Sequence, residues 1–181
     1  MKKIIVKCKL NDPREFELKL HDAEHDFGPV FWQHDRVYWP RGFKRNINYP
    51  CLIMRTEIKD IKQPPEYQLI IKRHISDSDA DIIHLTPILE YTEATHIIHQ
   101  LGFIKKAEVS RQRQVLKMGE DTIINLDKVE GLASTYAKIE ARLNDGESAT
   151  AVREDLVKTL AVLGETEITE ITYAELLAQK A

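Results

Sequence analysis

Hydrophobic and polar residues alternate with a period of two in several short stretches of the chain. Residues 2–10, "KKIIVKCKL", are the clearest case. Because successive side chains of a β-strand point to opposite faces, one face of this strand carries Ile4, Val6, Cys8 and Leu10, and the other carries Lys3, Ile5, Lys7 and Lys9. The first face is typical of a hydrophobic core. The second face carries three lysines, which is unusual opposite a hydrophobic core, and its role has to be explained.

The same pattern and the turn residues between the stretches predict further strands. They cover residues 30–39, 51–58, 67–73, 80–88, 105–117, 122–127 and 134–143. Tight connections such as "KDIKQPPE" (59–66) and "HISDSD" (74–79), together with the basic loop "PRGFKRNINYP" (40–50), favour an antiparallel meander.

Helices are predicted in three places, and one segment stays open. Residues 91–103 have a possible Thr92 cap and end at Gly102, residues 147–164 are amphipathic, and residues 172–179 form a short helix. Residues 14–20 fit a helix through Phe16 and Leu20, after a cap at Asn11 or Asp12, but they fit a strand equally well.

About eight strands with a few helices give an α+β fold. So many strands most easily hide their edges by closing into an antiparallel barrel, with the helices packed outside. A chain of 181 residues is long enough for one good core and short for two, so we expect a single domain over residues 1–181.

Composition limits the function classes. The chain has 26 Lys and Arg against 29 Asp and Glu, a net charge of −3, which gives no global reason to expect nucleic acid or an anionic membrane as a partner. No run approaches the roughly 18 apolar residues of a membrane span, and we expect a cytoplasmic protein. Cys8 and Cys51 show no metal-binding spacing and are expected to be reduced, structural thiols.

Basic residues recur on one face of several predicted strands. On any single strand, a solvated face is the better interpretation. If the sheet closes so that these faces turn inward, the basic side chains line a tunnel. Only a multiply charged anion would then offset the repulsion between them. A triphosphate has the required charge, and arginine binds its oxygens in bidentate fashion. The residues concerned are Lys7, Arg55, Lys72, Arg111, Arg113 and Lys138.

Several motifs together resemble the CYTH superfamily of triphosphate tunnel enzymes, specifically its class IV adenylyl cyclases. They are "LDKVEGLA" (126–133) before a strand ending in "AKIE" (137–140), "LGF" (101–103), "TYAELL" (172–177), "QHDRVYWP" (33–40) and "PRGF" (40–43). The resemblance implies a closed antiparallel barrel with outer helices, which agrees with the fold expected from the pattern. It also implies a triphosphate ligand such as ATP, held with Mg²⁺ or Mn²⁺.

Compared with the family pattern, the basic positions are kept and the acidic ones are mostly lost. The Glu-x-Glu-x-Lys motif of the first strand falls on Lys3, Ile5 and Lys7, and the alternating glutamates of the fifth strand fall on Ile82, His84 and Thr86. A later Glu-x-Glu falls on Lys138 and Glu140. Asp127 and Glu140 thus remain as metal-ligand candidates, and a divalent cofactor is doubtful because Lys3 and Lys138 lie close by.

Three functions follow. The first is binding of a nucleoside triphosphate or another polyphosphate, with catalysis weakened or lost. In this function Lys3 supplies the positive charge that a metal ion would otherwise give. The residues expected to bind phosphate are Lys3, Lys7, Arg55, Lys72, Arg111, Arg113 and Lys138. The second is an active adenylyl cyclase or triphosphatase. The third is a protein-interaction scaffold on the same barrel. The sequence names no catalytic residue and leaves the oligomeric state open, a dimer included.

Overall fold

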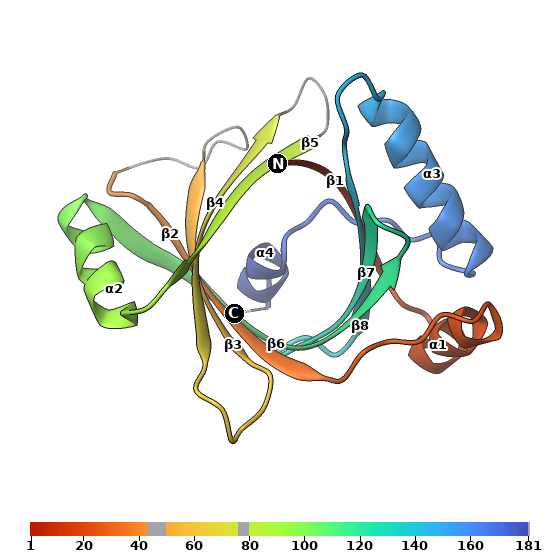
Figure 1. Ribbon diagram of the computed structural model, residues 1–181, viewed down its shortest axis with the longest axis horizontal. Coiled ribbons are helices and arrows are strands. Elements are labelled where there is room, and N and C mark those ends of the chain that lie inside the picture. Colours follow the sequence, from red (N-terminus) through yellow and green to blue (C-terminus); the bar gives the residue numbers. More distant parts are fainter. Residues whose placement is uncertain (43–49, 76–79, 181) are drawn as a thin grey trace.

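Eight strands form a closed antiparallel barrel in the computed structural model, which describes residues 1–42, 50–75 and 80–180. Around the barrel the order is β1-β5-β4-β3-β2-β6-β7-β8. Figure 1 looks along this ring of strands. The strands are β1 (Lys2–Lys9), β2 (Phe31–Pro40), β3 (Cys51–Ile58), β4 (Glu66–Ile75), β5 (Ala80–Ile88), β6 (Phe103–Met118), β7 (Thr122–Val129) and β8 (Thr135–Arg142). The predicted α+β barrel is therefore confirmed.

The connectivity is less simple than the predicted meander. Strands β2 to β5 and β6 to β8 are each neighbours in chain order, but β1 lies between β5 and β8. Among the described residues of β1 and β5, the paired positions are Lys2–Ile82 and Lys3–Asp81. Residues 74 and 75 extend β4 beyond the predicted strand, and residues 76–79 of the predicted turn, like residues 43–49 of the basic loop, lie outside the described residues.

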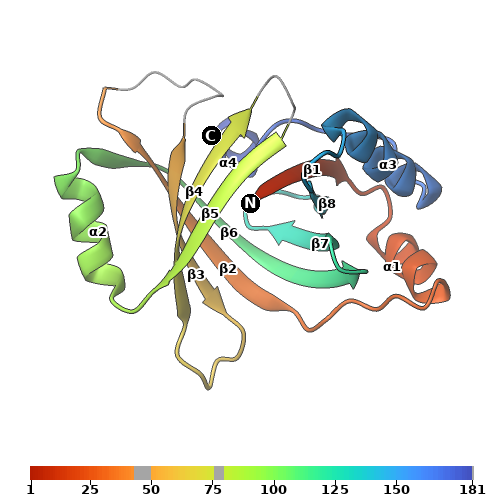
Figure 2. The ribbon, with the colours of Figure 1, turned by 45° about the horizontal axis from the view of Figure 1, so that its top comes forward.

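Two helices cover the outer face of β1, β7 and β8, as Figures 1 and 2 show. They are α1 (Pro13–Asp22) and α3 (Ala149–Val162). The segment 14–20 is a helix because Asp12 caps it, accepting hydrogen bonds from the amides of Arg14 (2.9 Å) and Glu15 (3.2 Å). Its buried residues are Phe16 and Leu20, four apart, whereas Leu18 is 60% exposed, which excludes the strand alternative.

A third helix, α2 (Tyr91–Gln100), packs on the opposite side of the barrel. Its Ile98 is buried with Tyr38 of β2 and Met54 of β3. Glu90 takes the N-cap position without a side-chain hydrogen bond, so the predicted cap at Thr92 is wrong, since Thr92 already lies in the first turn. The predicted end at Gly102 is confirmed by its φ of 81°, a conformation that glycine adopts without strain.

In the view of Figure 1, the short helix α4 (Tyr173–Ala178) lies across the opening of the ring of strands, and not on the outer face of the barrel as α1, α2 and α3 do. Tyr173 is buried with Val109, Val129 and Tyr136, which share strand faces with the predicted site residues. The turn at Gly131 fits closely around this helix, because a Cβ atom there would lie 2.9 Å from a Leu177 methyl carbon. The C-terminal segment thus closes part of the barrel interior.

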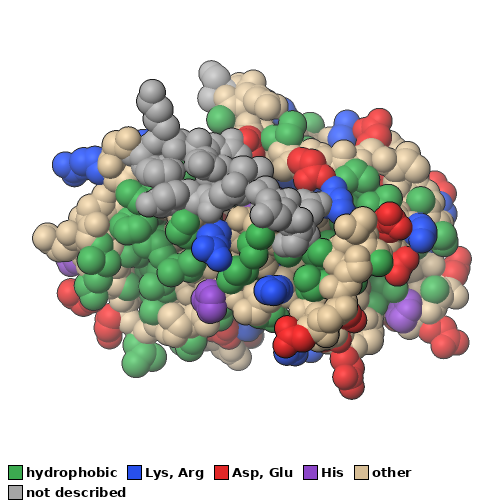
Figure 3. All heavy atoms as spheres, turned by 90° about the horizontal axis from the view of Figure 1, so that it is seen from above, with side chains coloured by type: hydrophobic (Ala, Val, Ile, Leu, Met, Phe, Trp, Pro, Cys, Tyr) green, Lys and Arg blue, Asp and Glu red, His purple; other side chains and the backbone are tan. Residues whose placement is uncertain are grey.

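No helix among the described residues is long and apolar enough to cross a membrane. On the face shown in Figure 3, the described basic side chains lie singly among hydrophobic and acidic ones. Cys8 and Cys51 are free thiols, and burial raises the pKa of Cys8 to about 12, which suits an unreactive structural residue.

Candidate functional site

The lysine face of β1 points into the barrel. Ile4, Val6 and Cys8 are fully buried beneath α1 and α3, in the core outside the barrel wall. Because side chains alternate, Lys3 and Lys7 must occupy the inner face. Lys3 accordingly reaches Glu140 on β8, with 2.9 Å between Nζ and Oε2. The face that had no obvious role in the sequence therefore lines the lumen.

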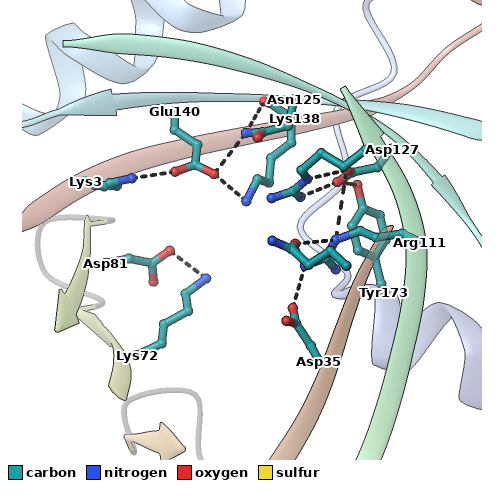
Figure 4. Close-up of polar contacts among 12 residues, drawn as sticks. Lys3, Asp35, Lys72, Asp81, Arg111, Asn125, Asp127, Lys138, Glu140 and Tyr173 are labelled. Carbon is teal, nitrogen blue, oxygen red and sulfur yellow. Dashed lines mark hydrogen bonds and ion pairs between the residues drawn. The ribbon is translucent and has the colours of Figure 1, made fainter. Parts of the chain in front are cut away.

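The other predicted basic residues share this orientation. Met54 packs outward against α2, which turns the adjacent Arg55 inward, and Ala137 and Ile139 pack outward, which turns Lys138 inward. Figure 4 shows the labelled lumen residues converging from several strands. The predicted orientation is confirmed for Lys3, Lys7, Arg55, Lys72, Arg111, Arg113 and Lys138. Their binding of phosphate stays a prediction.

Carboxylates lie between these cations. Glu140 accepts from Lys3 on one side and from Lys138 on the other, and the amide nitrogen of Asn125 donates to its Oε1 at 3.1 Å. Burial alone would raise the pKa of Glu140, but the two lysines outweigh it and hold that pKa well below its usual range. Glu140 is thus a buried, charged group shared by two lysines.

Asp127 is bound even more completely. Arg113 donates two hydrogen bonds of 2.6 Å to its two oxygens, and the Tyr173 hydroxyl donates a third of 2.9 Å. Its side chain is fully buried. Burial would raise the pKa of Asp127, but Arg113 and then Arg111 lower it from 3.8 to about 2. The sequence did not predict the contact with Tyr173, which joins α4 to the site.

Asp35 is a third buried carboxylate that binds basic side chains, and the sequence did not predict it. Arg55 binds it in bidentate fashion, with Nε–Oδ1 of 2.7 Å and Nη2–Oδ2 of 3.0 Å. Arg111 also donates to Asp35, and its Nε donates to the side-chain oxygen of Gln33 at 2.9 Å. These arginines lower the pKa of Asp35 in spite of its burial. Period-two alternation on β2 places Gln33 and Asp35 on one face, the signal that could have identified both.

Asp81 completes the pattern on β5. Lys72 lies 2.8 Å from its Oδ2, and the Nδ1 of His74 lies 3.3 Å from its Oδ1. Asp81 therefore shares the inner face with Lys72, and the assignment of the inner face to Ile82, His84 and Thr86 is wrong by one residue. A shift of one residue moves every side chain of a strand to the other face.

Lys7 is held by the C-terminal segment. Its ammonium donates to the carbonyl oxygen of Ile171 and lies 4.5 Å from the ring centre of Tyr173, and the guanidinium of Arg111 lies 5.6 Å from the same ring. Burial, followed by the neighbouring charge of Lys72, lowers the pKa of Lys7 to about 8. Burial likewise lowers the pKa of Lys138 to about 8.

The donor set does not fit a divalent metal ion. In the part of the chain that the structure describes, no group of three or more His, Cys, Asp or Glu side chains is arranged to hold one. The two predicted ligands, Asp127 and Glu140, are engaged by Arg113 and by Lys3 and Lys138. A hard cation needs several free oxygen ligands, and the adjacent ammonium groups would repel it.

Exposure divides the predicted cations into two groups. The side chains of Arg111 and Arg113 are each 6% exposed and bound on several sides, so they serve mainly to hold Asp35 and Asp127. Lys3, Arg55, Lys72 and Lys138 retain 18–36% exposure. The second group, with the half-buried Lys7, keeps part of its side-chain surface exposed.

Comparisons with known proteins bear on the fold. No protein-family model matches the chain, and no curated protein matches it. A solved structure of a Pyrococcus horikoshii protein has a TM-score of 0.84 at 21% identity, covering 99% of both chains. A candidate adenylate cyclase from Vibrio parahaemolyticus has a TM-score of 0.80 at 18% identity, covering 97% of both chains.

A third neighbour is a candidate adenylyl cyclase from Hippeastrum that is described as having a dominant triphosphatase activity. Its TM-score is 0.64 at 13% identity, over 99% of this chain and 96% of the other. At such identities the likeness establishes the fold. The chain shares with these neighbours the fold of a closed antiparallel barrel, which agrees with the fold that the resemblance to the CYTH superfamily implied.

Proposed function

We propose that this protein binds a nucleoside triphosphate or another polyphosphate inside the barrel without needing a divalent metal ion. The observation that carries the proposal is the convergence of Lys3, Lys7, Arg55, Lys72 and Lys138 on one lumen. A chain of phosphates can contact several of these cations at once, which a single anion cannot. The names of the neighbours, a candidate adenylate cyclase and a protein described as having triphosphatase activity, support this ligand class.

Metal-dependent catalysis would be weak or lost under this proposal. Phosphoryl and nucleotidyl transfer rely on a metal ion to stabilise developing charge, and its removal costs several kcal/mol, roughly three or more orders of magnitude in rate. The contacts of Asp127 and Glu140 with Arg113 and Lys3 leave few of their oxygen lone pairs free to coordinate such an ion. Lys3 and Lys138 would instead meet the charge of the ligand directly.

The experiment is calorimetric titration of ATP and tripolyphosphate, in EDTA and in Mg²⁺. We expect similar affinities in both conditions. Replacement of the partly exposed Lys72 by Gln should weaken binding by about tenfold or more, since a hydrogen bond to a charged group contributes roughly 1.5–3 kcal/mol. The matched control is Lys158→Gln on the outer helix α3, where the side chain is 71% exposed and pairs with Asp155.

An active cyclase or triphosphatase is the second candidate, favoured by the activity described for the Hippeastrum neighbour. Product formation that depends on Mg²⁺ or Mn²⁺ and is abolished by Asp127→Ala or Glu140→Ala would establish it. If the folded protein binds neither ATP nor tripolyphosphate in any condition, the barrel is better explained as a protein-interaction scaffold.

A further inference from the structure

The basic side chains of the lumen are already partly neutralised by carboxylates of the same chain. We infer that these carboxylates, Asp35 above all, are specificity-determining residues that occupy cations which a bound polyphosphate needs, so that only highly charged anions displace them. This inference rests on the proposed function and adds a selectivity for charge number to it.

The geometry of Asp35 is that of a bound anion. Its two oxygens receive the Nε and Nη2 groups of Arg55 at 2.7 and 3.0 Å, and Arg111 donates to it from the neighbouring strand β6. A phosphate group would bind a guanidinium through the same pair of N–H donors. Because Asp35 and a phosphate group compete for the same two N–H donors of Arg55, they cannot both accept these hydrogen bonds at once.

Burial makes this competition strong. The side chain of Asp35 is 8% exposed, and those of Arg55 and Arg111 are 18% and 6% exposed, so little water screens the charges. An anion that approaches Arg55 is attracted by the guanidinium and repelled by the carboxylate behind it. A single phosphate gains less from this cluster than from two unpaired arginines, because the carboxylate already offsets one of their two positive charges.

A longer phosphate chain meets several of these pairs together. Asp81 neutralises Lys72 at 2.8 Å, and Glu140 neutralises Lys3 at 2.9 Å, in the same lumen. An anion of high charge can displace or reorient these carboxylates at several points, and the gains add. The carboxylates therefore set a threshold of charge that an anion must exceed to bind.

The test removes one negative charge and keeps the shape of the side chain. In Asp35→Asn, both arginines stay charged at any working pH. In EDTA, calorimetric titration with orthophosphate, pyrophosphate and tripolyphosphate should show about tenfold tighter orthophosphate and pyrophosphate binding than in the parent protein, and a smaller gain for tripolyphosphate. The preference for tripolyphosphate over orthophosphate should shrink. The melting temperature without ligand should fall, because the arginines lose their partner.

A second variant and a control complete the design. Asp81→Asn releases Lys72, whose side chain is 36% exposed, so folding is less at risk, and it should change affinity in the same direction. The control is Glu108→Gln, because Glu108 pairs with Arg36 at 3.0 Å on the outer face of the same two strands, β2 and β6. This control should leave the affinity for all three anions unchanged.

The direction in which the tripolyphosphate affinity of the two variants changes tests the inference. Weaker or unchanged tripolyphosphate binding by both folded variants would overturn the inference and show that the carboxylates merely position the cations. A parent protein that fails to bind tripolyphosphate contradicts the proposed function instead, and binding gained in the variants would then still support the threshold. Absence of binding in parent and variants alike would overturn both.

Discussion

At the scale of single residues, the lumen is organised by buried ion pairs whose members depend on each other. Arg113 and Asp127 are 6% and 0% exposed and joined by two hydrogen bonds of 2.6 Å. Removing water from both charges is costly, and the pair contacts offset that cost only while both partners remain. Loss of either partner therefore leaves an uncompensated buried charge and destabilises the fold.

Asp127→Asn should lower the free energy of unfolding at pH 7 by about 3–5 kcal/mol, because it leaves Arg113 buried without its counter-charge. Tyr173→Phe, which removes one hydroxyl donor to the same carboxylate, should lower the free energy of unfolding by only about 1 kcal/mol.

The pKa of Asp127 is lowered from 3.8 to about 2, so its charge stabilises the fold fully above the unfolded pKa and loses this effect as pH falls towards 2. Denaturant unfolding at pH 7 and at low pH measures both effects. An equal cost of Asp127→Asn at both pH values would contradict this account.

At the scale of strands and helices, the alternating pattern predicted orientation well wherever one face was clearly apolar. On β1, Ile4, Val6 and Cys8 lie under helices, and the lysines face the lumen. On β5 the pattern failed, because "ADIIHLT" has an apolar residue on either face and the resemblance suggested the wrong one. Contacts between distant elements had no local signal: Tyr173 and Asp127 are 46 residues apart.

Strand β1 offers a direct test of its own role. In Lys3→Glu with Ile5→Glu, two carboxylates would join Glu140, which pairs with Ile5 in the β1–β8 register and with Lys3 through an ion pair. Tripolyphosphate binding in EDTA should weaken by at least tenfold, and Mn²⁺ binding should appear, because several oxygen ligands then converge. Lys2→Glu is the matched control, because Lys2 is exposed at the start of β1 and its side chain lies on the opposite face of the strand. Unchanged affinity in EDTA would mean that Lys3 does not meet the ligand.

At the scale of the whole molecule, the fold alone does not determine the function. The neighbours share the barrel at 13–21% identity, and one barrel can serve different chemistries. The chemistry of this chain therefore has to be argued from its own lumen, in which carboxylates pair with the cations. If this lumen binds a polyphosphate as proposed, the ligand adds to the stability of the folded barrel.

Tripolyphosphate in EDTA should therefore raise the melting temperature of the whole barrel. At a ligand concentration of about 100 times Kd, binding adds about 2.7 kcal/mol to the free energy of unfolding. For a domain of this size each kcal/mol corresponds to roughly 2–4 °C, so we expect a rise of about 5–10 °C. Orthophosphate at the same concentration should give a much smaller rise, and the Lys72→Gln variant a reduced one at that tripolyphosphate concentration. Thermal unfolding followed by circular dichroism measures the shift. A rise that requires Mg²⁺ would instead indicate that the barrel binds a metal–phosphate complex, as an active enzyme would.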